Sequence, residues 1–286
     1  MTPILRDFGA ASSASIIANL VTHPLENIKV RQIQYGTSVP TVFKEIVRNE
    51  GFSSLYRGMN AALIRAVISG GGRLTGFNTL KQVAIQHNIL ILNGNDGIYE
   101  VTIRALLATI SACTAQYVSA PFDLIRTRQA AFKGTEGTPS MYSIVRTVIR
   151  EHGLKGLFSG SSALMGRAIT FNIAQLLTYD ESKRQVVSYC DSLNENGLAT
   201  HVLASMCAGL AATTASSPFE NIKTLMQISE KKTGVVEITY QLYATRGLAA
   251  FFRGWLPLYF KIAPHTIIVF VVMERLRLVL GVKSID

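Results

Sequence analysis

Three acid–base pairs recur in this sequence with the same internal spacing. In each pair a lysine or arginine follows an aspartate or glutamate by three positions, and a proline stands two positions before the acid. The pairs are Glu26–Lys29, Asp123–Arg126 and Glu220–Lys223. Acid and base at this spacing can pair within one helix. Their recurrence also allows a ring in which each acid meets the base of another unit, and such a ring suits a gate because desolvation offsets much of the attraction between the charges.

A second set of cations lies seven residues after a glycine of each unit. The cations are Arg65, Arg167 and Lys261, and the glycines are Gly58, Gly160 and Gly254. Seven helical residues span about 10 Å, so the three groups stand at one height. Charged groups within apolar helices usually face a bundle interior, where three like charges repel one another unless an anion binds them. The pattern therefore predicts an anion site, and the competing interpretation is that the side chains snorkel to the membrane surface.

One further cation and a glycine triplet lie on the same predicted helix as Arg65. Arg73 follows Arg65 by eight residues, which places it about 12 Å further along an ideal helix and about 80° around it. There it could receive an incoming anion. Residues 70–72 are all glycine but lack the following Lys-Ser/Thr of a phosphate-binding loop, so close helix packing is the better interpretation.

These residues belong to a threefold repeat. The prolines of the acid–base motifs, Pro24, Pro121 and Pro218, are 97 residues apart. Each ends an uncharged run long enough to cross a membrane. The runs are Phe8–Leu25, Ala105–Phe122 and Gly197–Phe219. Each unit reads as a helix kinked at its proline, a short amphipathic helix and a second long helix. The short helices are expected at Pro40–Asn49, Tyr142–Glu151 and Val235–Thr245, and the repeats at residues 1–97, 98–194 and 195–286.

Composition favours a membrane protein over a nucleic-acid binder. Charged residues make up 16% of the chain, mean hydropathy is +0.27 and the net charge is +10. A chain this apolar is expected to carry its lysines and arginines in loops beside a membrane. Cys113, Cys190 and Cys207 are widely spaced and odd in number, which argues against a disulfide framework. No enzymatic or cofactor motif is evident, and any targeting information is expected to be internal.

The repeated motifs resemble the mitochondrial carrier family over the whole chain. The resemblance rests on proline–x–acid–x–x–base three times, each followed by Glu-Gly-x-x-x-x-aromatic-x-Gly or a close variant. It implies an all-α membrane protein with six transmembrane helices in three pseudo-threefold repeats, each with a short matrix-side amphipathic helix. It also implies alternating-access transport in the mitochondrial inner membrane, with both termini toward the intermembrane space. The expected partners are lipid and a small anionic metabolite. The protein is expected to act as a monomer, without cofactor, metal or nucleic acid.

The resemblance assigns the charged residues to two gates. For the matrix gate it implies the pairs Glu26–Arg126, Asp123–Lys223 and Glu220–Lys29, with Gln227 as a brace. Gln32 and Gln129 lie one residue too early for that bracing position. For the intermembrane-space gate it implies the ionic pairs Asp180–Arg277 and Glu274–Lys81, and a hydrogen bond between Asn78 and Lys183. The alternative for this second set is a group of ordinary interfacial charges.

The residues around the cations indicate a substrate class. Arg65 with Arg73, Arg167 with Asn172 and Gln175, and Lys261 before Pro264-His265 resemble the oxoglutarate and dicarboxylate branch. The resemblance implies exchange of dicarboxylates or oxo-acids such as malate and oxoglutarate. Carriers of uncoupling type, or of phosphate or sulfate, remain alternatives, as does a scaffold that transports nothing. Lys261 stands where this branch commonly has arginine, so one bidentate contact to a carboxylate is lost there.

Overall fold

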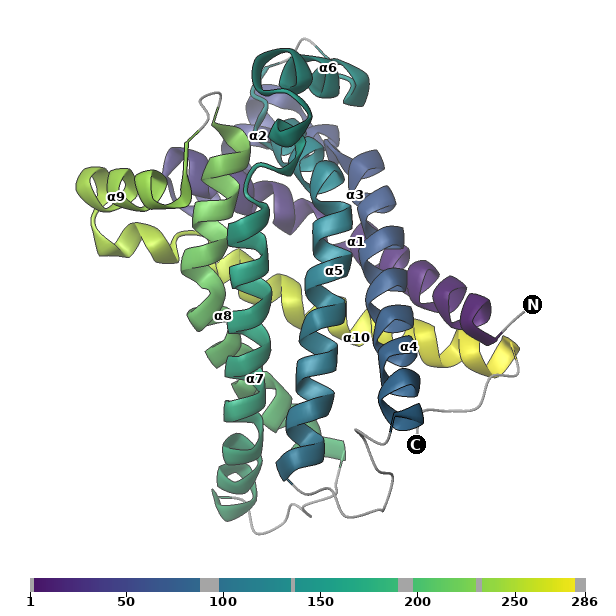
Figure 1. Ribbon diagram of the computed structural model, residues 1–286. Helices are drawn as coiled ribbons and strands as arrows, with labels where there is room; N and C mark the ends of the chain where they lie inside the picture. Colours follow the sequence, from purple (N-terminus) through teal and green to yellow (C-terminus); the bar gives the residue numbers. More distant parts are fainter. Residues whose placement is uncertain (1–2, 88–97, 135–136, 190–197, 230–232, 281–286) are drawn as a thin grey trace.

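Helices form all the regular structure that is described. The structure is a computed structural model that describes residues 3–87, 98–134, 137–189, 198–229 and 233–280. Within those residues each repeat contributes a long helix, a short helix, a single turn of 3-10 helix and a second long helix (Figure 1). The predicted all-α class is confirmed. No helix in the described residues is long and apolar enough to cross a membrane.

The first helix of every repeat runs through its proline. These helices are α1 (Pro3–Tyr35), α5 (Ile98–Ala131) and α8 (Leu198–Ile228), with Pro24, Pro121 and Pro218 in their interiors. The charged motif therefore continues the helix, as predicted from the sequence. In the described part of these helices the buried hydrophobic residues before each proline are alanines, such as Ala14, Ala18, Ala204 and Ala208. Small side chains let neighbouring helices approach closely.

The short helices appear close to their predicted positions. They are α2 (Val39–Glu50), α6 (Met141–His152) and α9 (Val235–Arg246), followed by the 3-10 turns η1 (Phe52–Tyr56), η3 (Leu154–Phe158) and η4 (Leu248–Phe252). A glycine at positive φ separates each short helix from its turn: Gly51, Gly153 and Gly247. A residue with a Cβ adopts that conformation only with strain.

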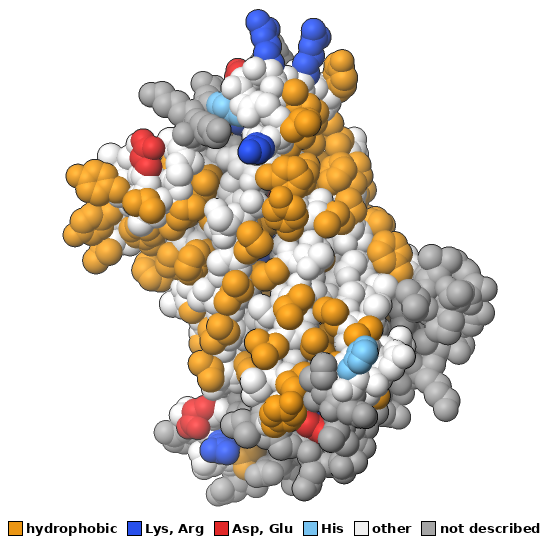
Figure 2. Space-filling view, in the orientation of Figure 1, with side chains coloured by type: hydrophobic (Ala, Val, Ile, Leu, Met, Phe, Trp, Pro, Cys, Tyr) orange, Lys and Arg blue, Asp and Glu red, His pale blue; other side chains and the backbone are white. Residues whose placement is uncertain are grey.

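The third short helix differs from the prediction. Ile238 and Leu242 of α9 are buried, but Val236, Tyr240 and Tyr243 are exposed, so α9 is apolar on both sides and not amphipathic. Figure 2 shows the contrast: hydrophobic side chains cover α9, whereas lysine and arginine side chains project from the end of the molecule formed by α6. The apolar content of α9 was visible in its sequence, but its outward orientation was not.

The second long helices close the bundle. They are α3 (Met59–Ala66) with α4 (Gly72–Gln86) in repeat 1, α7 (Ser161–Tyr189) in repeat 2 and α10 (Trp255–Leu280) in repeat 3. α7 packs along α8 of the next repeat, and α10 packs along α1, so the last repeat meets the first. The prediction of one unbroken second helix fails in repeat 1, where a π-helical turn, η2 (Val67–Gly71), separates α3 from α4. Among the three cysteines, Cys113 and Cys207 are free thiols and Cys190 lies outside the described residues.

The glycines at the π-turn pack against neighbouring helices. A Cβ on Gly70 would lie 2.2 Å from Ser15 Oγ of α1, and one on Gly71 would lie 2.5 Å from Phe8 and Ser12. A Cβ on Gly76 would lie 2.6 Å from Ser111 Oγ of α5. Gly70 and Gly71 of the triplet therefore serve close helix packing, as the sequence indicated, and the segment is a helical turn and not a phosphate loop.

We expect Gly70→Ala to lower the free energy of unfolding by about 1–3 kcal/mol, because the added methyl group overlaps Ser15. Gly72→Ala is the matched control, since its Cβ would find nothing nearer than Ala115 at 3.7 Å. Thermal melting of the purified protein in detergent measures both. Ser15→Gly should rescue Gly70→Ala, and equal melting of the two alanine variants would contradict the packing account.

Candidate functional site: an acid–base ring beneath three cations

A glycine at the start of each second helix sets the height of the site. Gly58, Gly160 and Gly254 all have positive φ. A Cβ on these glycines would lie 3.0 Å from the Arg126 carbonyl oxygen, 3.2 Å from the Lys223 carbonyl oxygen and 3.0 Å from Lys29 Cγ, respectively. Each second helix therefore begins against the basic residue of another repeat's motif. The cation seven residues later is held close to that motif as a result.

The six motif residues form one closed ring, which we call the acid–base ring: Glu26, Lys29, Glu220, Lys223, Asp123 and Arg126. Acids and bases alternate around it. In that order the nitrogen–oxygen distances are 2.6, 2.7, 3.3, 3.0 and 3.2 Å, and the closing Arg126–Glu26 distance is 2.9 Å. Their side chains are at most 5% exposed. Pairing within a helix and pairing between repeats therefore occur together, where the sequence posed them as alternatives.

The three cations that follow the glycines, which we call the site cations, contact the ring carboxylates. Arg65 Nε lies 2.8 Å from Asp123, Arg167 Nε lies 3.2 Å from Glu220, and Lys261 Nζ contacts Glu26. The expectation that only a bound anion could relieve their repulsion is corrected, because each cation lies against a carboxylate. The repeat symmetry, not evident before the helices were placed, brings each second-helix cation to the acid of the next repeat.

The acid–base ring and the site cations together carry more positive than negative charge. Within the described residues, six cations meet three carboxylates in this cluster. Its net formal charge is therefore three positive. Arg65 and Arg167 make no hydrogen bond to any described residue, and the site cations are 16–19% exposed, unlike the buried ring. Guanidinium groups with free N–H donors and excess positive charge favour a bound anion.

The π-turn changes where Arg73 points. One extra residue in a helical turn makes eight residues advance like seven, which brings Arg73 to within about 20° of Arg65 instead of about 80°. Arg73 interacts electrostatically with Arg167, and His265 with Lys261, Arg65 and Arg73. Ser111 of α5 donates a hydrogen bond to the Arg73 carbonyl at 2.7 Å. Arg73 forms no ion pair among the described residues, and the extra residue of the π-turn brings it to the side of the helix that carries Arg65.

The remaining predicted substrate residues lie on α7. The Asn172 side-chain amide lies 3.5 Å from Thr109 Oγ1 of α5, a long hydrogen bond. Gln175 is exposed and forms no hydrogen bond to a described residue. Neither contacts the acid–base ring, so any role in binding remains a prediction.

Most of the second predicted network lies beyond what the structure describes. Asp180, Glu274 and Arg277 lie outside the described side chains. Asn78, Lys81 and Lys183 are described and half-buried, and no hydrogen bond joins Asn78 to Lys183. That predicted contact is absent from this conformation, in which the acid–base ring is closed.

Gln227 is the only one of the three candidate glutamines that contacts the ring in the described residues. Its Nε2 donates to Asp123 Oδ2 at 3.0 Å, and its Oε1 accepts from Thr127 at 2.8 Å. Gln129 instead donates to the Pro139 carbonyl at 2.8 Å, and Gln32 Oε1 is buried without a partner. The one-residue shift seen in the sequence thus turns two of the glutamines away from the ring.

We expect Gln227→Ala to lower the free energy of unfolding by about 1–3 kcal/mol, because it leaves a buried ring carboxylate short of one donor. Gln129→Ala removes a glutamine outside the ring and is the matched control. Melting of both variants in detergent is the measurement. A Gln227→Ala protein that melts like the wild type would show that Gln227 does not brace the ring.

A cluster that the sequence analysis missed joins repeats 1 and 2. Glu50 accepts from Arg31 at 2.5 and 2.7 Å and from Arg57 at 2.5 Å, and Arg57 also donates to the carbonyls of Phe132 and Gly134. Burial alone would raise the pKa of Glu50. The Arg31 hydrogen bond and the charges of both arginines outweigh it and hold the pKa below its ordinary value. The sequence feature that could have indicated this cluster is Glu50, the acidic residue before Gly51.

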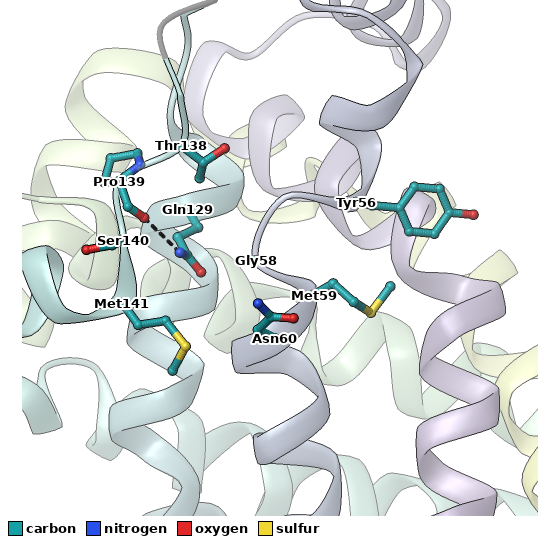
Figure 3. A pocket seen from close by; sticks show the side chains of 9 residues that line it. All are labelled: Tyr56, Gly58, Met59, Asn60, Gln129, Thr138, Pro139, Ser140 and Met141. Carbon is teal, nitrogen blue, oxygen red and sulfur yellow. Dashed lines mark hydrogen bonds between the residues drawn. The ribbon is translucent and has the colours of Figure 1, made fainter.

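A cavity of about 360 Å³ lies between repeats 1 and 2, away from the ring. It is lined by the start of α3, Gln129 of α5 and the segment that begins α6 (Figure 3). The Gln129–Pro139 hydrogen bond crosses its wall. None of the ring residues or site cations lines it, so it is separate from the candidate anion site.

Comparison with known proteins agrees with the repeat structure. The family model for mitochondrial carrier protein matches residues 1–88, 99–189 and 194–284. The chain is 30% identical to the mitochondrial dicarboxylate transporter of Saccharomyces cerevisiae, with 93% of this chain and 89% of that protein covered. It is 29% identical to mitochondrial citrate transporter F of Aspergillus niger, covering 94% and 87%. It is 27% identical to mitochondrial uncoupling protein 3 of Arabidopsis thaliana, covering 96% and 94%. The chain therefore belongs to the mitochondrial carrier family, whose members are transporters and not enzymes.

Proposed function

We propose that this protein exchanges small dicarboxylates or oxo-acids, such as malate and oxoglutarate, across the mitochondrial inner membrane by alternating access. In this proposal its helices span the membrane as six segments, and both termini face the intermembrane space. The observation that carries the proposal is the excess of three positive charges where the site cations meet the acid–base ring. A dicarboxylate would neutralise most of that excess.

The shared carboxylates would couple binding to opening. Each site cation contacts a ring carboxylate in the structure. An anion that binds the site cations competes with those carboxylates for them. The ring carboxylates then keep only their ring bases, which weakens the closed state. A ligand shifts a conformational equilibrium only by its differential affinity for the two states, and this competition supplies such a difference.

The arrangement of donors suits carboxylates. Arg65 and Arg167 can each present two N–H groups to one carboxylate, whereas Lys261 offers a point charge. Arg73 adds a cation near them, and Asn172 and Gln175 offer neutral groups that suit a carbonyl or hydroxyl. One relative reported above is named as a dicarboxylate transporter, which supports this class. Another is named as a citrate transporter, which supports a carboxylate substrate in general.

The test is uptake into liposomes that contain the purified protein. Vesicles preloaded with dicarboxylates, oxo-acids, tricarboxylates, phosphate, sulfate, amino acids or nucleotides are offered labelled compounds from the same panel. We expect exchange confined to dicarboxylates and oxo-acids. Uptake of nucleotides or cationic amino acids would refute the assignment, and uptake of sulfate or phosphate alone would retain only the anion site.

A second function is favoured by the similarity to a relative named as an uncoupling protein. An uncoupling-type carrier would show fatty-acid-dependent proton conductance in the same liposomes without a requirement for internal dicarboxylate. Measuring proton flux and labelled uptake in one preparation separates the two functions.

A further inference from the structure

An arginine from each repeat binds the end of the first helix of the next repeat. It donates to the carbonyl nine residues after the proline, in the last helical turn. The pairs are Arg31 with Ala130 at 3.1 Å, Arg128 with Gln227 at 3.0 Å and Arg246 with Ile33 at 3.1 Å. They run from repeat 1 to 2, from 2 to 3 and from 3 to 1. Carbonyls at a helix C-terminus lack partners within the helix and attract cations, so these contacts hold the repeats together outside the acid–base ring.

The third arginine comes from a different position in its repeat. Arg31 and Arg128 each lie seven residues after the proline, where repeat 3 has Leu225, which cannot donate a hydrogen bond. Arg246 lies immediately before Gly247. Repeat 1 has Glu50 at the equivalent place before Gly51. Compared with repeat 1, repeat 3 therefore has no base seven residues after its proline, and it has a base instead of an acid before the glycine.

The three contacts differ in burial and in what holds the arginine. Arg128 is half-buried and donates to the carbonyls of Gln227 and Ser229 at 3.0 and 3.3 Å. Arg31 is buried, and both of its Nη atoms bind Glu50, which Arg57 also binds. Arg246 is exposed, and its second hydrogen bond goes to the Gln34 carbonyl at 3.2 Å. No carboxylate pairs with Arg246 in the described part of the chain. The Glu50 contact lies within repeat 1 and fixes the Arg31 guanidinium, which donates to the Ala130 and Phe132 carbonyls of repeat 2 at 3.1 and 2.7 Å. A buried guanidinium held in this way loses less entropy on binding those carbonyls than an exposed arginine without a carboxylate partner.

We infer that Arg246 is a positioning residue that ties repeat 3 to repeat 1 in place of the missing base at Leu225, and that this tie is the weakest of the three. Repeats 3 and 1 therefore separate first at the end of the bundle that carries the short helices. The first part concerns folding and is independent of the substrate. The second part rests on the proposed alternating access.

The test restores the arrangement of repeat 1 in repeat 3, with an acid at position 246 and a base at position 225. Arg246→Glu turns a carboxylate toward the α1 carbonyls and should lower the melting temperature by about 3 °C or more. Arg146→Glu, on the exposed face of α6, is the control and should melt like the wild type. Adding Leu225→Arg to Arg246→Glu recreates the arrangement of repeat 1 and should restore melting to at least the wild-type value. Arg246→Ala, alone and with Leu225→Arg, provides the same comparison if the glutamate variant does not fold.

Two results would overturn the assignment of Arg246: equal melting of Arg246→Glu and Arg146→Glu, or a double variant no more stable than Arg246→Glu. Uptake into liposomes tests the weak tie. A double variant that is stable but exchanges substrate more slowly than the wild type supports it, because its third tie has been strengthened. Exchange at the wild-type rate or faster overturns that half of the inference alone.

Discussion

Replacing Arg167 by alanine is expected to lower substrate exchange by about 100-fold or more, because in the proposed site this partly buried cation binds the anionic substrate. The bundle should still fold. Glu220 loses its contact with Arg167 but keeps Lys29 at 2.7 Å and Lys223 at 3.3 Å. Arg167→Lys should retain intermediate activity, since it keeps the charge and loses the two-pronged donor.

The control for this variant is Arg150→Ala, which removes an exposed arginine of α6 in the same repeat. Exchange is measured in liposomes and folding by thermal melting in detergent. A folded Arg167→Ala protein that exchanges substrate at the wild-type rate would remove Arg167 from the anion site. Loss of exchange in Arg150→Ala would show that the assay responds to surface charge and not to the site.

The second large effect is expected from reversing a pair in the acid–base ring. Lys29→Glu and Glu220→Lys should each nearly abolish exchange and destabilise the protein, since each places like charges side by side in a buried ring. The double variant restores the contact between residues 29 and 220. It should recover only part of the loss, because Lys29 also contacts Glu26 and Glu220 also contacts Lys223.

A double-mutant cycle on melting and exchange measures this coupling. We expect an interaction energy of about 1–3 kcal/mol between the two positions. Simple additivity would mean that the contact between repeats contributes nothing. The recurring three-residue spacing between acid and base would then be explained by pairing within each helix alone.

The threefold repeat determined which parts of the fold and of the site the sequence could predict. Period and spacing located the first and short helices, the motif charges and the three cations, because each lies at a fixed distance from a proline or glycine. Contacts between repeats were less accessible. That Arg65 reaches Asp123 depends on how the second helix of one repeat packs against the first helix of the next. The π-turn in repeat 1 lies where Gly70 and Gly71 leave no room for a Cβ beside Ser15 and Ser12, and helical periodicity does not reveal such a close approach.

Repeat 3 differs from the other repeats at two positions whose role the sequence analysis did not identify. Leu225 and Arg246 stand in the aligned sequence at positions that are charged differently in repeat 1. Their meaning requires the position of the α1 carbonyls, which only the folded bundle provides. The outward aromatic face of α9 likewise depends on which side of the helix packs on α8, and two apolar sides in one short helix leave that choice open to sequence reasoning.

The closed ring has an electrical consequence. Each repeat carries its own acid and base, 2.6 to 3.3 Å apart. If the repeats move apart, each carboxylate stays paired with the base on its own helix. The groups that move are therefore neutral pairs. Moving a neutral pair through the field of an energised membrane does little work, whereas each unit charge that crosses costs about 2.3 kcal/mol per 100 mV. We therefore expect any voltage dependence of exchange to arise from the site cations and the charge of the cargo, with the ring itself insensitive to the membrane potential.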